Sequence, residues 1–165
     1  MKTLYLIRHA KSSWDYPELT DFERPLSKRG LRDAPFMGML LREKQIKPDL
    51  FLSSPAKRAW TTAQLFASAM DFGADKIVAE PRIYEASRET LLSVIQALPD
   101  ELQSVAVFCH NPAVTDLANH LTDKKVDNIP TSGVFSIAFD SPTWRSLGEG
   151  KGVFQFFLYP KKFLK

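Results

Sequence analysis

Short apolar runs alternate with longer segments of helical period along this 165-residue chain. The runs are rich in Val, Ile, Leu and Phe, whereas the segments between them place apolar residues three and four positions apart. Parallel strands that are buried on both faces and joined by helices give this pattern. We therefore predict strands at residues 3–7, 50–52, 77–79, 105–109, 135–139 and 154–158.

Helices are predicted between the strands from their capping residues. The first helix is expected to begin near Asp33, with Pro35 in its first turn, where the fixed φ of proline is favourable. The other helices are expected to begin at Ser54-Pro55, Ser87 and Asn111-Pro112. Residues 144–152 join the last two strands, and a connection this short favours an antiparallel pair. The predicted fold class is α/β, with a mostly parallel sheet of about six strands and an antiparallel strand near the C-terminus.

Length and composition favour one domain spanning residues 1–165. A hydrophobic content of 44% is enough for one sizeable core and leaves little room for a second. The formal net charge of +3 is spread along the chain, except for a cluster at Lys161, Lys162 and Lys165 that we interpret as a solvated tail. So mild an excess gives little support for a nucleic-acid partner, and we expect none.

The sequence also bears on the cellular compartment. No run of about 18 apolar residues is present, so we expect no membrane partner. Residues 1–3 lead directly into a predicted strand instead of the apolar core of a signal peptide. Cys109 is the single cysteine, which excludes an internal disulfide and fits a reducing compartment. We therefore expect a cytoplasmic protein.

Two histidines and two arginines stand where predicted strands end. Arg8-His9 follows the first strand, His110 follows the strand at 105–109, and Arg58 lies in the first turn of the helix after residues 54–55. Ligands of open α/β sheets bind at the carboxyl ends of the strands. We therefore expect these four side chains to converge at one edge of the sheet.

Such a group of side chains suits a phosphoryl substrate. Guanidinium groups bind phosphate oxygens in bidentate fashion and stay charged at every relevant pH. Their charge disfavours protonation of a neighbouring imidazole, which would keep His9 neutral and able to attack phosphorus. Helix N-termini at residues 54–55 and 111–112 would add backbone N–H groups around the same point.

Three segments resemble the signatures of the histidine phosphatase superfamily, also called phosphoglycerate mutase-like: Arg8-His9, residues 53–63 (SSPAKRAWTTA) and His110-Asn111-Pro112. Residues 21–30 (DFERPLSKRG) and Pro130-Thr131 resemble its branch of SixA-type phosphohistidine phosphatases. The order and spacing of the segments agree with the family, and the resemblance covers nearly the whole chain.

The resemblance implies a three-layer α/β/α sandwich in which His9 is phosphorylated and then hydrolysed, while Arg8, Arg58 and His110 hold the phosphate. It implies no metal ion and no organic cofactor. It also implies a substrate that is phosphorylated on histidine, displayed on a partner protein such as a phosphotransfer domain. Hydrolysis is expected over mutase action, because no insertion is long enough to cap the pocket around a small sugar phosphate.

The chain departs from the family pattern at three positions. Ala10 and Cys109 stand where glycine is common, and Asp15 stands where relatives with an Arg-His-Gly-x-Ser-x-Trp pattern place a phosphate-contacting asparagine. A carboxylate at that position would repel phosphate. Asp15 must therefore either turn away or accept a bond from Arg8 or Lys11.

Glu85 resembles the acidic residue of the family and is the candidate proton donor. An alkoxide leaving group needs a proton as it departs, whereas a phosphohistidine can leave as a neutral imidazole. Glu85 is therefore either an acid or a polar residue of the pocket wall. Ser12 and Thr131 are candidate phosphate contacts, although loop polarity and a turn with Pro130 explain them equally well.

Other enzyme classes fit the sequence less well. Cysteine-dependent tyrosine phosphatases need an arginine six positions after the nucleophile, and Thr115 stands six positions after Cys109. No Gly-x4-Gly-Lys-Ser/Thr loop is present, and no clustered ligand spacing supports a metal hydrolase. Two alternatives to a phosphohistidine phosphatase stay open: a phosphatase for small phosphomonoesters, and a noncatalytic phosphate-binding module. The sequence leaves the oligomeric state open.

Overall fold

The computed structural model of the protein describes residues 1–164, so Lys165 of the predicted tail lies outside the described residues. Strand β1 (Lys2–Arg8) lies inside a six-stranded sheet of order β3-β2-β4-β1-β5-β6. The other strands are β2 (Leu50–Ser53), β3 (Val78–Ala79), β4 (Ser104–Cys109), β5 (Val134–Phe139) and β6 (Val153–Leu158). Each predicted strand is therefore present, with ends that differ by at most one residue.

Strand β5 is the one strand that runs against the others. It pairs antiparallel with both β1 and β6, while β1, β2, β3 and β4 pair parallel with one another. The mostly parallel sheet with an antiparallel strand near the C-terminus is thus confirmed. Because β5 is reversed, its beginning lies at the sheet edge where β1 and β4 end.

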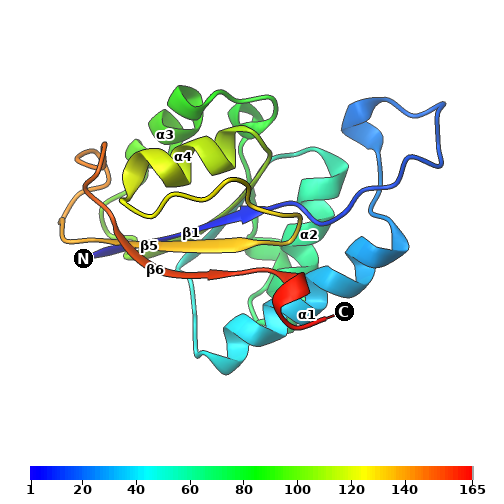
Figure 1. Cartoon of the computed structure of the whole chain (residues 1–165), viewed down its shortest axis with the longest axis horizontal. Helices are drawn as coiled ribbons and strands as arrows, with labels where there is room; N and C mark the ends of the chain where they lie inside the picture. Colours follow the sequence, from blue (N-terminus) through cyan, green and yellow to red (C-terminus); the bar gives the residue numbers. More distant parts are fainter. Residues whose placement is uncertain (165) are drawn as a thin grey trace.

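Helices cover both faces of the sheet and complete three layers (Figure 1). Helices α1 (Lys28–Glu43) and α2 (Lys57–Ala69) pack on one face, around Met37 and Phe66. Helices α3 (Arg88–Gln96) and α4 (Ala113–Leu121) pack on the other, in a second core. Residues 4–7 of β1 are buried between the two cores, as the unbroken apolar run predicts.

The predicted start of the first helix is wrong. Helix α1 begins five residues earlier, because the Ser27 hydroxyl is the N-cap and accepts the Gly30 N–H at 3.2 Å. Asp33 lies inside the helix, where its fully buried carboxylate pairs with Arg29 and Arg32. Pro35 is also internal and lacks the N–H that would bond the residue 31 carbonyl, which lies on an exposed part of the helix.

Helix α2 begins at Lys57, two residues after the predicted Ser54-Pro55 start, whereas the predicted starts of α3 and α4 hold. Ser87 caps α3 through the Thr90 N–H, and α4 follows Pro112 directly. Within residues 1–164, none of the helices is both long enough and apolar enough to span a bilayer. The single domain and the cytoplasmic location stay predictions of the sequence.

Candidate active site

Pairing of β1 with β4 brings two imidazoles together at the sheet edge. Arg8 lies in register with Cys109, and the His9 N–H donates to the Cys109 carbonyl at 3.1 Å. His110 follows directly, so the His9 and His110 ring centroids lie 5.2 Å apart. The reversed β5 contributes the preceding turn, in which the Ser132 N–H donates to the carbonyls of Arg8 and His9, each at 3.1 Å.

The hydrogen bond of His9 defines which ring nitrogen is free. Its Nδ1 lies 2.7 Å from the carbonyl oxygen of Ala10, an atom that can only accept. The proton of the neutral ring therefore resides on Nδ1, and Nε2 carries the lone pair. The Ala10 N–H donates to the Thr62 hydroxyl at 2.9 Å, and Thr62 donates to the Arg58 carbonyl at 2.6 Å. These bonds tie the loop after β1 to the helix that carries Arg58.

Both histidines are held in the neutral form. The pKa of His9 is lowered to about 3, mainly by burial and in smaller part by His110, Arg58 and Arg8, against the raising effect of the Ala10 bond. Burial and Arg58 likewise lower the pKa of His110 to about 4. His110 Nε2 lies 2.8 Å from the buried Ser54 hydroxyl, which orients the ring.

Arg58 is held by a residue that the sequence reasoning did not single out. The Arg58 guanidinium donates to the Asp21 backbone carbonyl at 2.7 Å and to its carboxylate at 3.0 Å. The Tyr84 hydroxyl donates to the same carboxylate at 2.7 Å. These bonds, led by that of Tyr84, lower the pKa of Asp21 to about 2, and the pKa of Tyr84 rises to about 12. Asp21 is therefore an ionised clamp on Arg58.

Arg24 adds a third guanidinium at this edge, and it is buried. It was not predicted from the sequence. It donates to the Ser12 hydroxyl and, at 3.2 Å, to the Ser13 carbonyl, and it pairs with Asp21 at 3.1 Å. Its other face stacks on Trp14, with 3.4 Å between Arg24 Cζ and the ring centroid. One feature of the sequence could have indicated this ion pair: Asp21 and Arg24 are three residues apart, across a short helical turn (η1, Asp21–Glu23).

Unpartnered buried atoms mark the same place. Within residues 1–164, four buried side-chain polar atoms lack a hydrogen-bond partner, and three of them are Arg8 Nε, His110 Nδ1 and Ser132 Oγ. A buried polar atom without a partner costs about 1–3 kcal/mol. Their concentration at one sheet edge indicates a site that is completed by a polar ligand.

A cavity of about 230 Å³ opens at this edge. Its lining residues are Arg8, His9, Lys11, Ser12, Trp14, Arg24, Arg58 and Thr131. No carboxylate is among them, and the one carboxylate that pairs with these cations within residues 1–164, that of Asp21, leaves the lining with a net positive charge. Four of the predicted phosphate contacts line the cavity, namely Arg8, Arg58, Ser12 and Thr131, although the Ser12 hydroxyl is already bound by Arg24. The fifth, His110, lies beside His9 but is not among the lining residues.

Two predicted acidic residues do not line this cavity. Glu85 is exposed, in the left-handed region with φ of 58°, and follows Tyr84, whose ring packs edge-on to His110 at 5.7 Å. Its role as proton donor stays a prediction. Asp15 is also exposed, and within residues 1–164 its carboxylate accepts no bond from Arg8 or Lys11. Asp15 therefore turns away from the phosphate-binding edge.

Two other kinds of chemistry, a cysteine nucleophile and a metal site, have no support at this edge within residues 1–164. Cys109 is fully buried, and burial raises its pKa to about 12, which disfavours the thiolate. In the part of the chain that the structure describes, no three His, Cys, Asp or Glu side chains are grouped as metal ligands.

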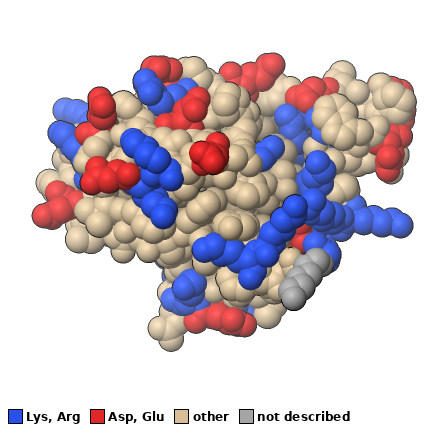
Figure 2. Space-filling model, in the orientation of Figure 1, with Lys and Arg blue, Asp and Glu red and all other residues tan. Residues whose placement is uncertain are grey.

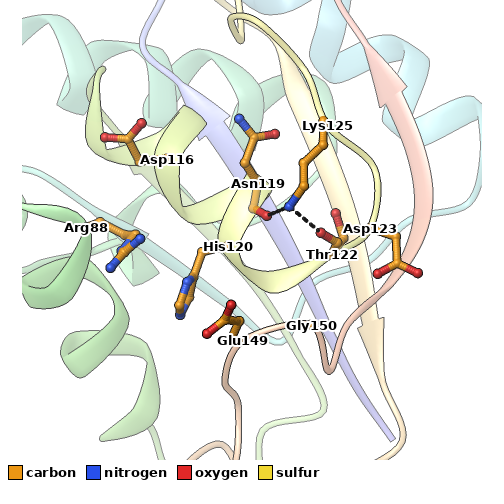
Figure 3. Close-up of a pocket in the computed structure, with 9 residues that line it drawn as sticks. All are labelled: Arg88, Asp116, Asn119, His120, Thr122, Asp123, Lys125, Glu149 and Gly150. Carbon is orange, nitrogen blue, oxygen red and sulfur yellow. Dashed lines mark hydrogen bonds between the residues drawn. The ribbon is translucent and has the colours of Figure 1, made fainter.

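A larger cavity, of about 470 Å³, lies between α3, α4 and the connection before β6 (Figure 3). Arg88, His120 and Lys125 share its lining with Asp116, Asp123 and Glu149. Lys125 donates to the carbonyls of Asn119 and Thr122, at 2.6 and 3.4 Å, and so satisfies the end of α4. The positive and negative charges that line this larger cavity therefore largely compensate one another.

Comparison with known proteins agrees with this geometry. The sequence model of the histidine phosphatase superfamily (branch 1) matches residues 4–91. An uncharacterized Mycobacterium tuberculosis protein is 35% identical over 139 residues, which cover 78% of this chain and 84% of the relative. A protein of Agrobacterium tumefaciens, provisionally assigned as the phosphohistidine phosphatase SixA, is 31% identical, with a TM-score of 0.82 over 96% of this chain and 98% of the other.

The fold is shared with a further solved structure, the protein histidine phosphatase SixA complexed with tungstate. It is 23% identical, with a TM-score of 0.82 over 97% of this chain and 98% of the other. The family match spans more than half of the chain, and its first part contains Arg8 and His9. The chain therefore belongs to the histidine phosphatase superfamily (branch 1), as a phosphatase of that superfamily.

Proposed function

We propose that this protein removes the phosphoryl group from phosphohistidine on a partner protein, through a covalent intermediate on His9. The observation that carries the proposal is the neutral His9 ring, bonded to Ala10 through Nδ1, in a cavity whose other lining residues are cationic or uncharged. A nucleophile of this kind must keep its lone pair at working pH, and burial beside guanidinium groups has that effect.

In the first step, His9 Nε2 attacks phosphorus in line with the bond to the leaving group. The new P–N bond forms as the P–N bond of the substrate breaks, and the substrate imidazole departs. Nδ1 keeps its proton throughout, because the Ala10 carbonyl cannot remove it. The phosphorylated ring is therefore protonated at Nδ1, which makes its P–N bond reactive toward water.

The cations stabilise the transferred group. Charge spreads over the three equatorial oxygens of the flattened phosphoryl group, and fixed cations lower the barrier by neutralising it. Arg8 Nε and His110 Nδ1 are buried polar atoms without hydrogen-bond partners, and oxygens of a bound phosphoryl group would supply such partners. Arg58 is already aligned by Asp21, so little reorganisation is needed at the moment of transfer.

In the second step, water attacks the phosphorus of the intermediate. The P–N bond to His9 breaks, its electron pair returns to Nε2, and inorganic phosphate leaves with the water oxygen and both of its protons, so the neutral ring returns. The exposed position of Glu85 favours a substrate whose leaving group needs little help from an acid, as phosphohistidine does. The SixA-like relative from Agrobacterium tumefaciens supports the same substrate class.

Rapid quenching into alkaline SDS with labelled substrates tests the proposal, because a phosphohistidine linkage survives in base. The wild-type protein is mixed with a ³²P-phosphohistidine peptide or with a labelled alkyl phosphomonoester, quenched, and analysed for label on the protein. We expect base-stable, acid-labile label on His9 and faster turnover of the peptide. His9→Ala should carry no label, and His120→Ala, which changes a histidine outside the cavity, serves as the matched control.

Each contrary outcome has a defined meaning. Turnover without label on the protein in the quenched samples, or normal turnover by His9→Ala, contradicts the covalent mechanism. Faster turnover of the phosphomonoester would instead favour the small-molecule phosphatase. Binding of phosphate without turnover of either substrate would identify a noncatalytic module.

A further inference from the structure

Basic side chains gather on one face of the molecule, beside the candidate active site. Figure 2 shows a band of Lys and Arg over the first half of α1 and the segment after β6. We call this band the α1 basic surface, and it consists of the exposed residues Lys28, Arg29 and Arg32 of α1 and Lys161 and Lys162 of the turn η4 (Pro160–Lys162).

Packing of the C-terminal segment on α1 makes this surface continuous. The rings of Phe36 and Phe163 lie 6.0 Å apart, which fixes η4 against the helix. Positions 29, 32 and 36 lie on one stripe of a helix, since they are spaced by three and four residues. Arg29 and Arg32 therefore lie on the side of α1 that leads toward Lys161 and Lys162.

One carboxylate compensates only part of the positive charge of this surface. Residues 24–32 and 150–164 contain no Asp and no Glu. The one acidic neighbour on the first half of α1, Asp33, is fully buried and pairs with Arg29 and Arg32, whose side chains stay 43% and 56% exposed. Asp33 thus holds two guanidinium groups in place while presenting no negative charge to solvent.

The α1 basic surface adjoins the catalytic cavity. The carbonyl of Lys11, a cavity residue, accepts the N–H of Ser27 at 2.8 Å and its hydroxyl at 3.1 Å. A Cβ added at Gly30 would come within 2.2 Å of the same carbonyl, so the first turn of α1 lies directly against the cavity loop. A protein that inserts a phosphohistidine into the cavity would therefore cover part of this surface.

On the loop that precedes η1 and within η1 itself, the charge has the opposite sign. Asp15, Glu18 and Glu23 are exposed there, close to the exposed Trp14 and Phe22. An acidic partner is repelled by this loop and attracted by α1. The charge distribution thus selects both the sign of the partner surface and the direction of its approach.

We infer that the α1 basic surface docks an acidic face of the protein that displays the phosphohistidine. This inference rests on the proposed function and adds to it the side from which the substrate protein binds. Charged surfaces of this kind act mainly on the association rate and depend on salt. Binding of the substrate protein should therefore depend on the surface, whereas chemistry in the cavity should not.

The test compares two substrates on three proteins. The surface variant combines Lys28→Glu, Lys161→Glu and Lys162→Glu, three exposed lysines that lie outside the cavity. The control variant combines Lys76→Glu, Lys124→Glu and Lys151→Glu, which change the net charge equally at exposed positions elsewhere. The substrates are phosphoramidate and a phosphorylated histidine-phosphotransfer domain with acidic residues around its phosphohistidine, and thermal melting checks that each variant is folded.

We expect kcat/KM of the surface variant for the phosphorylated domain to fall at least about tenfold at low salt, through KM. Its kcat/KM for phosphoramidate should stay within about twofold of wild type, and the control variant should resemble wild type on both substrates. Raising NaCl from about 20 to about 300 mM shortens the screening length from about 20 to about 6 Å. Salt should therefore slow wild type on the domain and remove most of its advantage over the surface variant.

Other outcomes would overturn the inference. Equal loss in the surface and control variants would show that net charge matters and the surface does not. A surface variant that loses binding to a fluorescent oligonucleotide or to phosphatidylserine vesicles, with unchanged turnover of the domain, would assign the surface to a different partner. Failure of wild type on both phosphorylated substrates would instead reject the proposed function, and this inference with it. If the glutamate variants fail to fold, the corresponding glutamine variants replace them.

Discussion

Two cavities of this protein differ in size and in charge, and we place the proposed chemistry in the smaller one. The cavity at the ends of β1 and β4 measures about 230 Å³ and is lined by four cations and no carboxylate. The cavity beside α4 measures about 470 Å³, and its lining combines two cations with three carboxylates: Arg88, Lys125, Asp116, Asp123 and Glu149. Three unpartnered buried atoms lie in residues at the first edge. Net positive charge and unpartnered polar atoms, and not volume, are therefore the grounds on which we propose the smaller cavity as the anion site.

Substitution of the nucleophile should give the largest contrast between the cavities. His9→Ala should lower turnover of a phosphohistidine peptide by about 10³–10⁶-fold, because the covalent step is lost. His120→Ala, in the larger cavity, should leave turnover within about twofold. Steady-state kinetics measures both, and a comparable loss in the two variants would refute the assignment of chemistry to the smaller cavity.

Removal of a guanidinium should give the next largest effect. Arg58→Ala should reduce kcat/KM by about 10²–10³-fold, equivalent to about 3–4 kcal/mol of transition-state stabilisation. Arg88→Ala, which removes a guanidinium from the larger cavity, is the matched control and should have little effect. A loss below about tenfold for Arg58→Ala would exclude Arg58 from the site.

Glu85→Gln sharpens the comparison at the rim of the smaller cavity. If Glu85 protonates leaving groups, the variant should lose about 10²-fold on an alkyl phosphomonoester, which needs the proton. Its loss of activity on a phosphohistidine peptide should be much smaller, because the imidazole can leave as a neutral ring without a proton from Glu85. The ratio of the two kcat/KM values is the measurement, and equal losses would contradict a role in protonation.

The pH dependence of stability should show the smallest effect. Because the pKa values of His9 and His110 lie at about 3 and 4 in the folded protein and near 6.5 after unfolding, the unfolded chain binds more protons below pH 6.5. The free energy of unfolding should therefore fall as pH drops from about 6.5 to about 4, by at most about 1.4 kcal/mol per pH unit for each histidine.

Urea unfolding of wild type and His9→Gln at several pH values isolates this contribution. Carboxylates affect both proteins alike, so the difference between the two curves reports on His9 alone. The variant should lose less stability than wild type as pH falls through this window. Parallel curves would mean that His9 is not held neutral by its surroundings.

Periodicity and strand-end residues were enough to predict the sheet and four members of the site. Arg8, His9 and His110 follow apolar runs whose parallel pairing is a property of the fold class, and Arg58 follows a serine-proline helix start. The start of α1 was missed because Ser27 and Asp33 are both capable N-caps, and only packing of Asp33 between two arginines decides between them.

Asp21, Arg24 and Tyr84 could not be predicted from local pattern. Their contacts join the loop before α1 to α2 and to the turn before α3, separated by up to 63 residues. Such contacts depend on how irregular segments lie after the core has formed, and no hydrophobic period encodes that. Glu85 illustrates the reverse case, since a family likeness identified it but its side chain does not line the cavity.

The central position of β1 has a consequence for how the protein is made. Leu4 pairs with Val105 on one side and with Ile137 on the other, so β1 is synthesised well before both of its partners. Pairing over such separations is slow, because long loops must close first. If His9 is the nucleophile, we expect no catalysis until β5 has emerged, and the appearance of activity during translation would time the completion of the sheet.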